Sequence, residues 1–150
     1  MEAALTMLAA GGIAVVGRSP FYESEPVPRS DQPWFVNAVA RLRTGLAPEE
    51  LLARLHDVEH AFGRERRERN EARPLDLDLL DYDGIVRQDA ALHLPHPRLH
   101  ERAFVLKPLA DVAPAWRHPV LGRTAGDLLA ALPEEARHGT RPRRAAPVER

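Results

Sequence analysis

Two aspartates, Asp76 and Asp78, stand two residues apart in the run Leu75-Asp76-Leu77-Asp78-Leu79. In an extended strand such residues point to the same face and lie about 6 to 7 Å apart, while the leucines occupy the other face. Neighbouring carboxylates repel each other unless a cation lies between them. Hard oxygen ligands beside a phosphate suit Mg²⁺. The spacing therefore predicts either a magnesium site or a half-exposed strand with two solvated acids.

An arginine-rich stretch over residues 64–74 leads directly into this pair. Its arginines are Arg64, Arg66, Arg67, Arg69 and Arg73. Cations beside a carboxylate metal site are what phosphoryl transfer requires, because they stabilise charge on the phosphate oxygens. In that case the stretch would be mobile without ligand and would order over a bound triphosphate. The alternative is a charged surface loop in which the interspersed acids Glu65, Glu68 and Glu71 neutralise the arginines.

Two other groups could contact a ligand. His96 lies between Pro95 and Pro97, which restrict its backbone, so it could donate a hydrogen bond to a phosphate or simply be exposed. Phe35 and Asn37 share one face of a predicted strand. An aromatic ring beside an amide suits a flat polar heterocycle, although the same pair could belong to a second small apolar cluster.

The elements that must position these residues follow from periodicity and end signals. Helices are expected over 2–10, 48–62 and 124–132, with Gly63 ending the second and a Thr124–Asp127 capping box starting the third. Strands are expected over 13–16, 34–44 and 75–80, and Asp83-Gly84 is a turn signal. Within 34–44 the even-numbered residues should face the core and the odd-numbered ones a wetter side. This order of elements predicts a small α+β sandwich.

The composition sets limits on the class of protein. The chain has 150 residues, of which 44% are hydrophobic and 29% charged, so it can bury a core. A net charge of -1 argues against a protein that coats nucleic acid, and the lack of cysteine excludes disulfides and thiolate zinc sites. No apolar stretch approaches the roughly 20 residues of a membrane-spanning helix. We expect a cytoplasmic protein with one domain over 1–132 and a disordered Arg/Pro-rich tail over 133–150.

Several longer stretches form a specific combination that covers residues 13–132. They are SPFYESEPV, DQPWFVNAV, EHAFGRERRERN, ARPLDLDLLDYDG, LPHPRLHERAFVLKPLADVAP and TAGDLLAAL. Together they resemble the 6-hydroxymethyl-7,8-dihydropterin pyrophosphokinase family of folate biosynthesis. The resemblance implies a ferredoxin-like α/β sandwich that transfers pyrophosphate from ATP to the pterin hydroxymethyl group and releases AMP. We expect it to act as a monomer.

The resemblance also implies roles for individual residues. Asp76 and Asp78 would hold two Mg²⁺ ions, Phe35 and Phe104 would sandwich the pterin, and Asn37 would bind its edge. The remaining pterin contacts implied are Ser24, Pro26 and Val27. The implied ATP-side residues are Glu59, Arg66, Arg73, His96 and Arg102. The implied catalytic residues are His96 and the two arginines that would close over the reacting phosphates, Arg64 and Arg73.

The chain departs from the family pattern in its loops and at its front. Asn70 stands where some members have a tryptophan, and His93 stands where a threonine often occurs. Family members begin with a strand and a GSNLG-like turn, whereas this chain starts inside the helix that follows. By the resemblance, the missing strand would be the central one of the sheet, so its two neighbours, the strands near 34–44 and 75–80, should not pair with each other. A second interpretation is therefore a non-catalytic remnant that binds a pterin or nucleotide without turnover.

Overall fold

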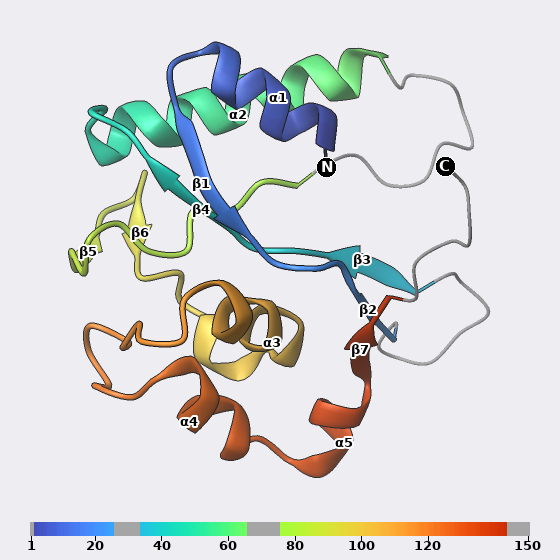
Figure 1. Ribbon diagram of the computed structural model, residues 1–150. Coiled ribbons are helices and arrows are strands. Elements are labelled where there is room, and N and C mark those ends of the chain that lie inside the picture. Colours follow the sequence, from blue (N-terminus) through green and yellow to red (C-terminus); the bar gives the residue numbers. More distant parts are fainter. Residues whose placement is uncertain (1, 26–33, 66–75, 144–150) are drawn as a thin grey trace. The chain divides into compact units, whose positions relative to one another are not determined.

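The computed structural model describes residues 2–25, 34–65 and 76–143 (Figure 1). The chain divides into two compact units, each made of two separate stretches of sequence. The first unit contains Met1–Val16 and Leu42–Pro97, and the second contains Gly17–Arg41 and Arg98–Arg150. No helix in the described ranges combines the length and the apolar character that crossing a bilayer requires.

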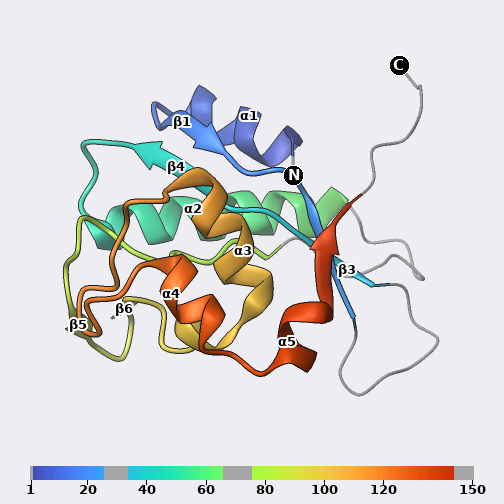
Figure 2. The same cartoon turned by 60° about the horizontal axis from the view of Figure 1, so that its bottom comes forward.

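The first unit is built on two packed helices, α1 (Glu2–Ala10) and α2 (Pro48–Glu65), which lie side by side (Figures 1 and 2). Helix α1 has the predicted bounds. Helix α2 begins at Pro48, a favourable first position, but it continues through Gly63 to Glu65, so the predicted stop is wrong. A helical glycine keeps its backbone hydrogen bonds and costs only about 1 kcal/mol relative to alanine, which a long helix tolerates.

The apolar faces of these helices form the core of the first unit. Its buried members are Ala4, Leu8, Ile13, Leu51, Leu55 and Val58. Leu42, Leu77 and Leu79 are half-buried and pack against this core. A short hairpin of β5 (Arg87–Gln88) and β6 (His93–Leu94) completes the regular structure here. Asp83 and Gly84 have φ values of 51° and 74°, which confirms the predicted turn.

The predicted strand over 34–44 is two strands, β3 (Phe35–Asn37) and β4 (Ala40–Arg43), which belong to different sheets. Strand β4 pairs with β1 (Ala14–Arg18), and β3 pairs with β2 (Tyr22–Ser24). Val39, which lies between β3 and β4, makes two hydrogen bonds with Ser19. The Ser19 N–H donates to the Val39 carbonyl (2.8 Å), and the Ser19 Oγ accepts the Val39 N–H (3.0 Å).

The predicted alternation of faces holds in β4 but fails in β3. Leu42 is half-buried while Arg41 and Arg43 are exposed, as expected. In β3, however, Phe35 is 38% and Val36 44% exposed. Because the pairing partner changes at Ser19, the predicted core face does not continue from β4 into β3.

The second unit has a three-stranded antiparallel sheet in the order β3-β2-β7, where β7 is Thr140–Pro142. Helix α3 (Ala103–Val112) packs against this sheet, and a 3₁₀ turn (Leu99–Glu101) precedes it. Helix α4 (Ala125–Ala130) packs against α3, and α5 (Glu134–His138) leads into β7 (Figure 2). Mixed helices and antiparallel strands make this an α+β fold, as predicted.

The predicted disordered tail over 133–150 is wrong for residues 134–142, which form α5 and β7. Strand β7 is the short sequence Thr-Arg-Pro, which has no local strand pattern. Its pairing with β2, more than 100 residues earlier in the chain, makes it a strand. The capping box of α4 is confirmed: the Thr124 side chain accepts the Asp127 N–H, and the Asp127 side chain accepts the Thr124 N–H.

Candidate active site

The segment 76–80 carries the two candidate metal ligands and lies in the first unit. It alternates in exposure like a strand, but it forms no ladder with any strand of the described part of the chain, so the predicted strand over 75–80 is wrong. Other groups take its backbone hydrogen bonds. The Leu77 N–H donates to Oε2 of Glu59 at 2.5 Å, and the Leu80 carbonyl accepts the His96 N–H at 2.9 Å.

Asp76 and Asp78 are both exposed, whereas Leu77 and Leu79 are half-buried against the α1–α2 core. The two carboxylates therefore lie on the solvent side of the segment and the leucines on the other, as the spacing predicts. The apolar contacts of the leucines hold the segment against the helices. They leave both acids accessible to a ligand.

Glu59 fixes this segment from α2. Its half-buried carboxylate accepts the N–H of Leu77, which lies between the two aspartates. A carboxylate accepting a backbone N–H makes a charge-assisted hydrogen bond, roughly twice as strong as a neutral one. Together with the bond between His96 and Leu80, this contact gathers Glu59, Asp76, Asp78 and His96 in one part of the first unit.

The candidate pterin residues lie in the second unit. In the β2–β3 register Ser24 is opposite Phe35 and Tyr22 is opposite Asn37, so these four side chains share one face of the sheet. The Asn37 amide donates to Oγ of Ser24 at 3.4 Å, which is a long hydrogen bond.

Helix α3 covers this same face, because the Tyr22 hydroxyl donates to the Asp111 carboxylate of α3. Phe104 lies in the first turn of α3 and is half-buried. The sheet face with Phe35 and Asn37 is therefore the face on which the helix bearing Phe104 packs. The guanidinium carbon of Arg102, which immediately precedes α3, is 5.4 Å from the Phe104 ring centroid, within cation–π range.

Two sets of hydrogen bonds that hold α3, those of Tyr22 and those of Lys107, were not predicted from the sequence. Burial, followed by the hydrogen bond to Asp111, raises the pKa of Tyr22 from 10.0 to about 12. Lys107 donates through Nζ to the carbonyls of Arg137 (2.7 Å) and Thr140 (2.5 Å). Burial, and then the charge of Arg137, lowers the pKa of Lys107. The spacing of Phe104, Lys107 and Asp111 along one helix face is the signal that could have revealed them.

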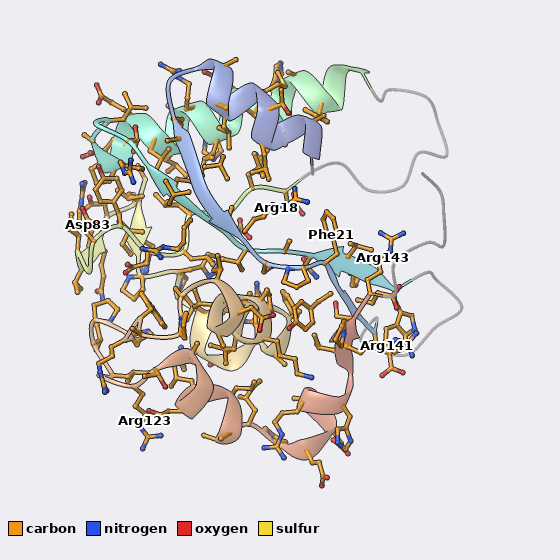
Figure 3. The ribbon with its side chains drawn as sticks, in the orientation of Figure 1. Arg18, Phe21, Asp83, Arg123, Arg141 and Arg143 are labelled. Atoms are coloured by element: carbon orange, nitrogen blue, oxygen red, sulfur yellow. The ribbon has the colours of Figure 1, made fainter. Side chains whose placement is uncertain are left out.

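The opposite face of the sheet is basic and aromatic. Figure 3 shows Arg141 on β7, with Arg143 and Phe21 beyond the end of that strand, and the Arg143 N–H donates to the Phe21 carbonyl at 2.8 Å. Arg141 forms an ion pair with Glu23 at 3.2 Å, and its guanidinium carbon is 4.2 Å from the Trp34 ring centroid. None of the described candidate site residues belongs to this face.

Several candidate residues lie outside the described part of the chain. They are Pro26, Val27, Arg66 and Arg73, together with the side chain of Arg64, whose backbone is in the last turn of α2. The predicted ordering of residues 64–74 over a triphosphate also concerns this region and stays a prediction.

Comparisons with known proteins agree on one family. A 2-amino-4-hydroxy-6-hydroxymethyldihydropteridine pyrophosphokinase of Pseudomonas aeruginosa is 47% identical over 81% of this chain and 74% of that protein. The protein of the same name from Methylorubrum extorquens is 42% identical over 84% of this chain and 78% of that protein. The folic acid synthesis protein fol1 of Pneumocystis carinii is 41% identical over 79% of this chain, which spans only 16% of that longer protein.

The resemblance seen in the sequence motifs is thus confirmed over most of the chain. Residues 1–114 match the profile of one protein family, and this match includes Glu59, Asp76, Asp78, His96 and Phe104. This chain belongs to the 7,8-dihydro-6-hydroxymethylpterin-pyrophosphokinase (HPPK) family.

Proposed function

We propose that this protein transfers pyrophosphate from ATP to the hydroxymethyl group of 6-hydroxymethyl-7,8-dihydropterin, releasing AMP, as a step of folate biosynthesis. Membership of the family and the names of the relatives support this activity. The observation that carries it is the exposed pair Asp76 and Asp78, fixed to α2 by the bond between Glu59 and Leu77. No observation favours the non-catalytic alternative.

The donor set suits magnesium. Among the described residues no three His, Cys, Asp or Glu side chains come together as a complete metal site. Mg²⁺ is commonly held by one or two carboxylates, with waters and substrate phosphates completing its shell. Asp76 and Asp78 would hold two Mg²⁺ ions in this way. When bound, these ions would neutralise charge on the phosphates and bring the nucleophile close to them.

On the pterin side, Phe35 and Phe104 would stack on the two faces of the ring, and Asn37 would pair with its polar edge. The long bond from Asn37 to Ser24 can be exchanged for a ligand contact at little cost. Pro26 and Val27 would contribute from the segment after β2. Arg102, whose guanidinium lies within cation–π range of the Phe104 ring, would contact the ATP.

The reaction requires little covalent chemistry from the protein. The pterin hydroxyl oxygen forms a bond to the β-phosphorus, the bond from that phosphorus to the α–β bridging oxygen breaks, and the hydroxyl proton is released. The chain would orient the two substrates so that the hydroxyl attacks opposite the leaving oxygen, and it would stabilise the charge that develops on the bridging oxygen. Arg64, Arg73 and His96 would supply this stabilisation, while Glu59, Arg66 and Arg102 would hold the ATP. A monomer in the cytoplasm would suffice for this chemistry, although one plant relative is named as mitochondrial.

The test is to mix the purified protein with ATP, Mg²⁺ and the dihydropterin, and to measure AMP and pterin diphosphate by liquid chromatography with mass spectrometry. We expect one AMP for each pterin diphosphate. Asp78→Ala should abolish turnover and keep the melting temperature, since removing a carboxylate relieves repulsion. Asp57→Ala, which removes an exposed acid from α2, is the matched control and should stay active. Absence of AMP with the unaltered protein would refute the proposed function.

A further inference from the structure

The segment from α5 to β7 is part of the sheet that carries the candidate pterin residues. Strand β7 pairs with β2 along its whole length, with Ser24 opposite Thr140 and Tyr22 opposite Pro142. The ladder continues beyond both ends, because the Glu25 N–H donates to the Gly139 carbonyl (2.9 Å) and the Arg143 N–H to the Phe21 carbonyl (2.8 Å). This segment lies outside residues 1–114, which carry the family match.

One side chain ties this segment to α3. Lys107 is the only lysine of the chain, and its half-buried ammonium group donates to the carbonyls of Arg137 and Thr140. Arg137 lies in the last turn of α5, and Thr140 is the first residue of β7. Lys107 therefore holds the segment at the point where it enters the sheet. Hydrogen bonds from a charged donor are among the stronger ones in proteins.

The same contact bears on the candidate pterin residues. Phe104 precedes Lys107 by three residues on α3, and residues with this spacing are neighbours on one helix face. Ser24 lies opposite Thr140 in the β2–β7 ladder and accepts the hydrogen bond of Asn37 from β3. A shift of Thr140 relative to Lys107 would thus change the separation between Phe104 and the sheet residues that would bind the pterin edge.

We propose that Lys107 is a positioning residue of the pterin site: by holding α5 and β7 against α3, it sets the spacing between Phe104 and the pair of Ser24 and Asn37. This inference rests on the proposed function. Lys107 itself does not touch the pterin, and its contribution is to pterin affinity. Glu59 and His96, two of the ATP-side residues, lie in the first unit, whereas Lys107, α5 and β7 all lie in the second.

Three full-length variants test the proposal. Lys107→Met keeps an unbranched side chain that is one atom shorter and removes its donors. Lys107→Arg keeps the charge and donors, and Arg117→Met is the matched control. Arg117 is an exposed cation of the same unit that also donates to a backbone carbonyl, that of Gly122. We expect Lys107→Met to raise the KM for the pterin about tenfold and the KM for ATP by less than about twofold. Lys107→Arg should recover part of the loss, and Arg117→Met should match the unaltered protein.

A purely structural role would lower the melting temperature and change both KM values alike, or neither. Either result would overturn the proposal, as would a Lys107→Arg variant no better than Lys107→Met. If the unaltered protein forms no AMP, the proposed function fails. If it turns over normally while Lys107→Met keeps its pterin KM, only this inference fails.

A second measurement covers the case in which Lys107→Met does not fold. With one lysine, the unaltered protein has only two reactive amines, at Lys107 and at the N-terminus. Coupling between sites is reciprocal, so bound pterin should strengthen the Lys107 contact and slow reductive methylation of that amine. We expect saturating pterin to slow it about fivefold or more, with no such effect from a non-hydrolysable ATP analogue. Equal rates with and without pterin, followed by mass spectrometry, would contradict the proposal.

Discussion

Tyr22 is a buried residue of the second unit, and its hydroxyl donates to Asp111. Its pKa is raised to about 12, above the unfolded value of 10.0, so the neutral form is favoured in the folded protein. The stabilisation is complete below pH 10 and is lost as the pH rises toward 12. Tyr22→Phe should lower the melting temperature at neutral pH and flatten its alkaline fall in scanning calorimetry. An unchanged alkaline fall in this variant would contradict the assignment.

Glu59 holds the segment that carries the candidate metal ligands. Glu59→Ala would leave the Leu77 N–H without its acceptor and release Asp76 and Asp78 from their fixed position. We expect kcat to fall about tenfold or more and the Mg²⁺ concentration for half-maximal rate to rise. Glu59→Gln keeps an oxygen that can accept the N–H and should retain more activity. If Glu59→Ala has the Mg²⁺ dependence of the unaltered protein, the segment does not need this contact.

For single residues, the sequence predicted which way a side chain points better than it predicted which group forms a hydrogen bond with it. The spacing of Asp76 and Asp78 was sufficient to place both acids on the exposed side, because the leucines between them prefer the core. Nothing local indicated that Glu59 would accept the N–H of Leu77, 18 residues later. The contact depends on how α2 packs against the extended segment, and packing of this kind is set by the whole unit.

The N-terminus of helix α4 is determined by residues that are close together in the sequence. Thr124 and Asp127 form a reciprocal capping box at the N-terminus of this short helix. Thr124→Ala should lower the free energy of unfolding by about 1 kcal/mol, since an N-cap hydrogen bond is lost. Thr124→Ser keeps the accepting hydroxyl and should cost little. Urea unfolding of both variants measures the difference, and equal losses would indicate that the methyl group of the threonine is the important feature.

Helices and turns that are specified by nearby residues were predictable, whereas strands that depend on pairing with a distant segment were not. Helix α1, the capping box of α4 and the Asp83-Gly84 turn follow from nearby residues alone. Strand β7 and the separation of β3 from β4 depend on which strand lies alongside. The extended segment 76–80 has the period of a strand, but α2 and His96 take its backbone bonds. The alternation of apolar and polar residues indicates which side chains are buried, but a strand also requires a neighbouring strand with which its backbone can form hydrogen bonds.

At the scale of the whole molecule, the chain passes between the two units three times, after Val16, Arg41 and Pro97. The described candidate residues divide in the same way. Glu59, Asp76, Asp78 and His96 belong to the first unit, whereas the candidate pterin residues and Arg102 belong to the second. Both stretches of the first unit lie within residues 1–97, but the second unit needs residues from each side of Pro97. The two units should therefore respond differently to a cut at this point.

A fragment of residues 1–97 contains the whole of the first unit, so we expect it to keep helical α1 and α2 by circular dichroism. Its strands β2 and β3 lack α3 and β7, and these two strands should form only when a fragment of residues 98–150 is added. Trp34 can report this step, because Arg141 of β7 lies over its ring. The second tryptophan, Trp116, lies in the added fragment and is replaced by Trp116→Phe. Binding should then shift Trp34 emission. Unchanged emission, with helices retained in fragment 1–97, would mean that β2 and β3 do not need β7 to form.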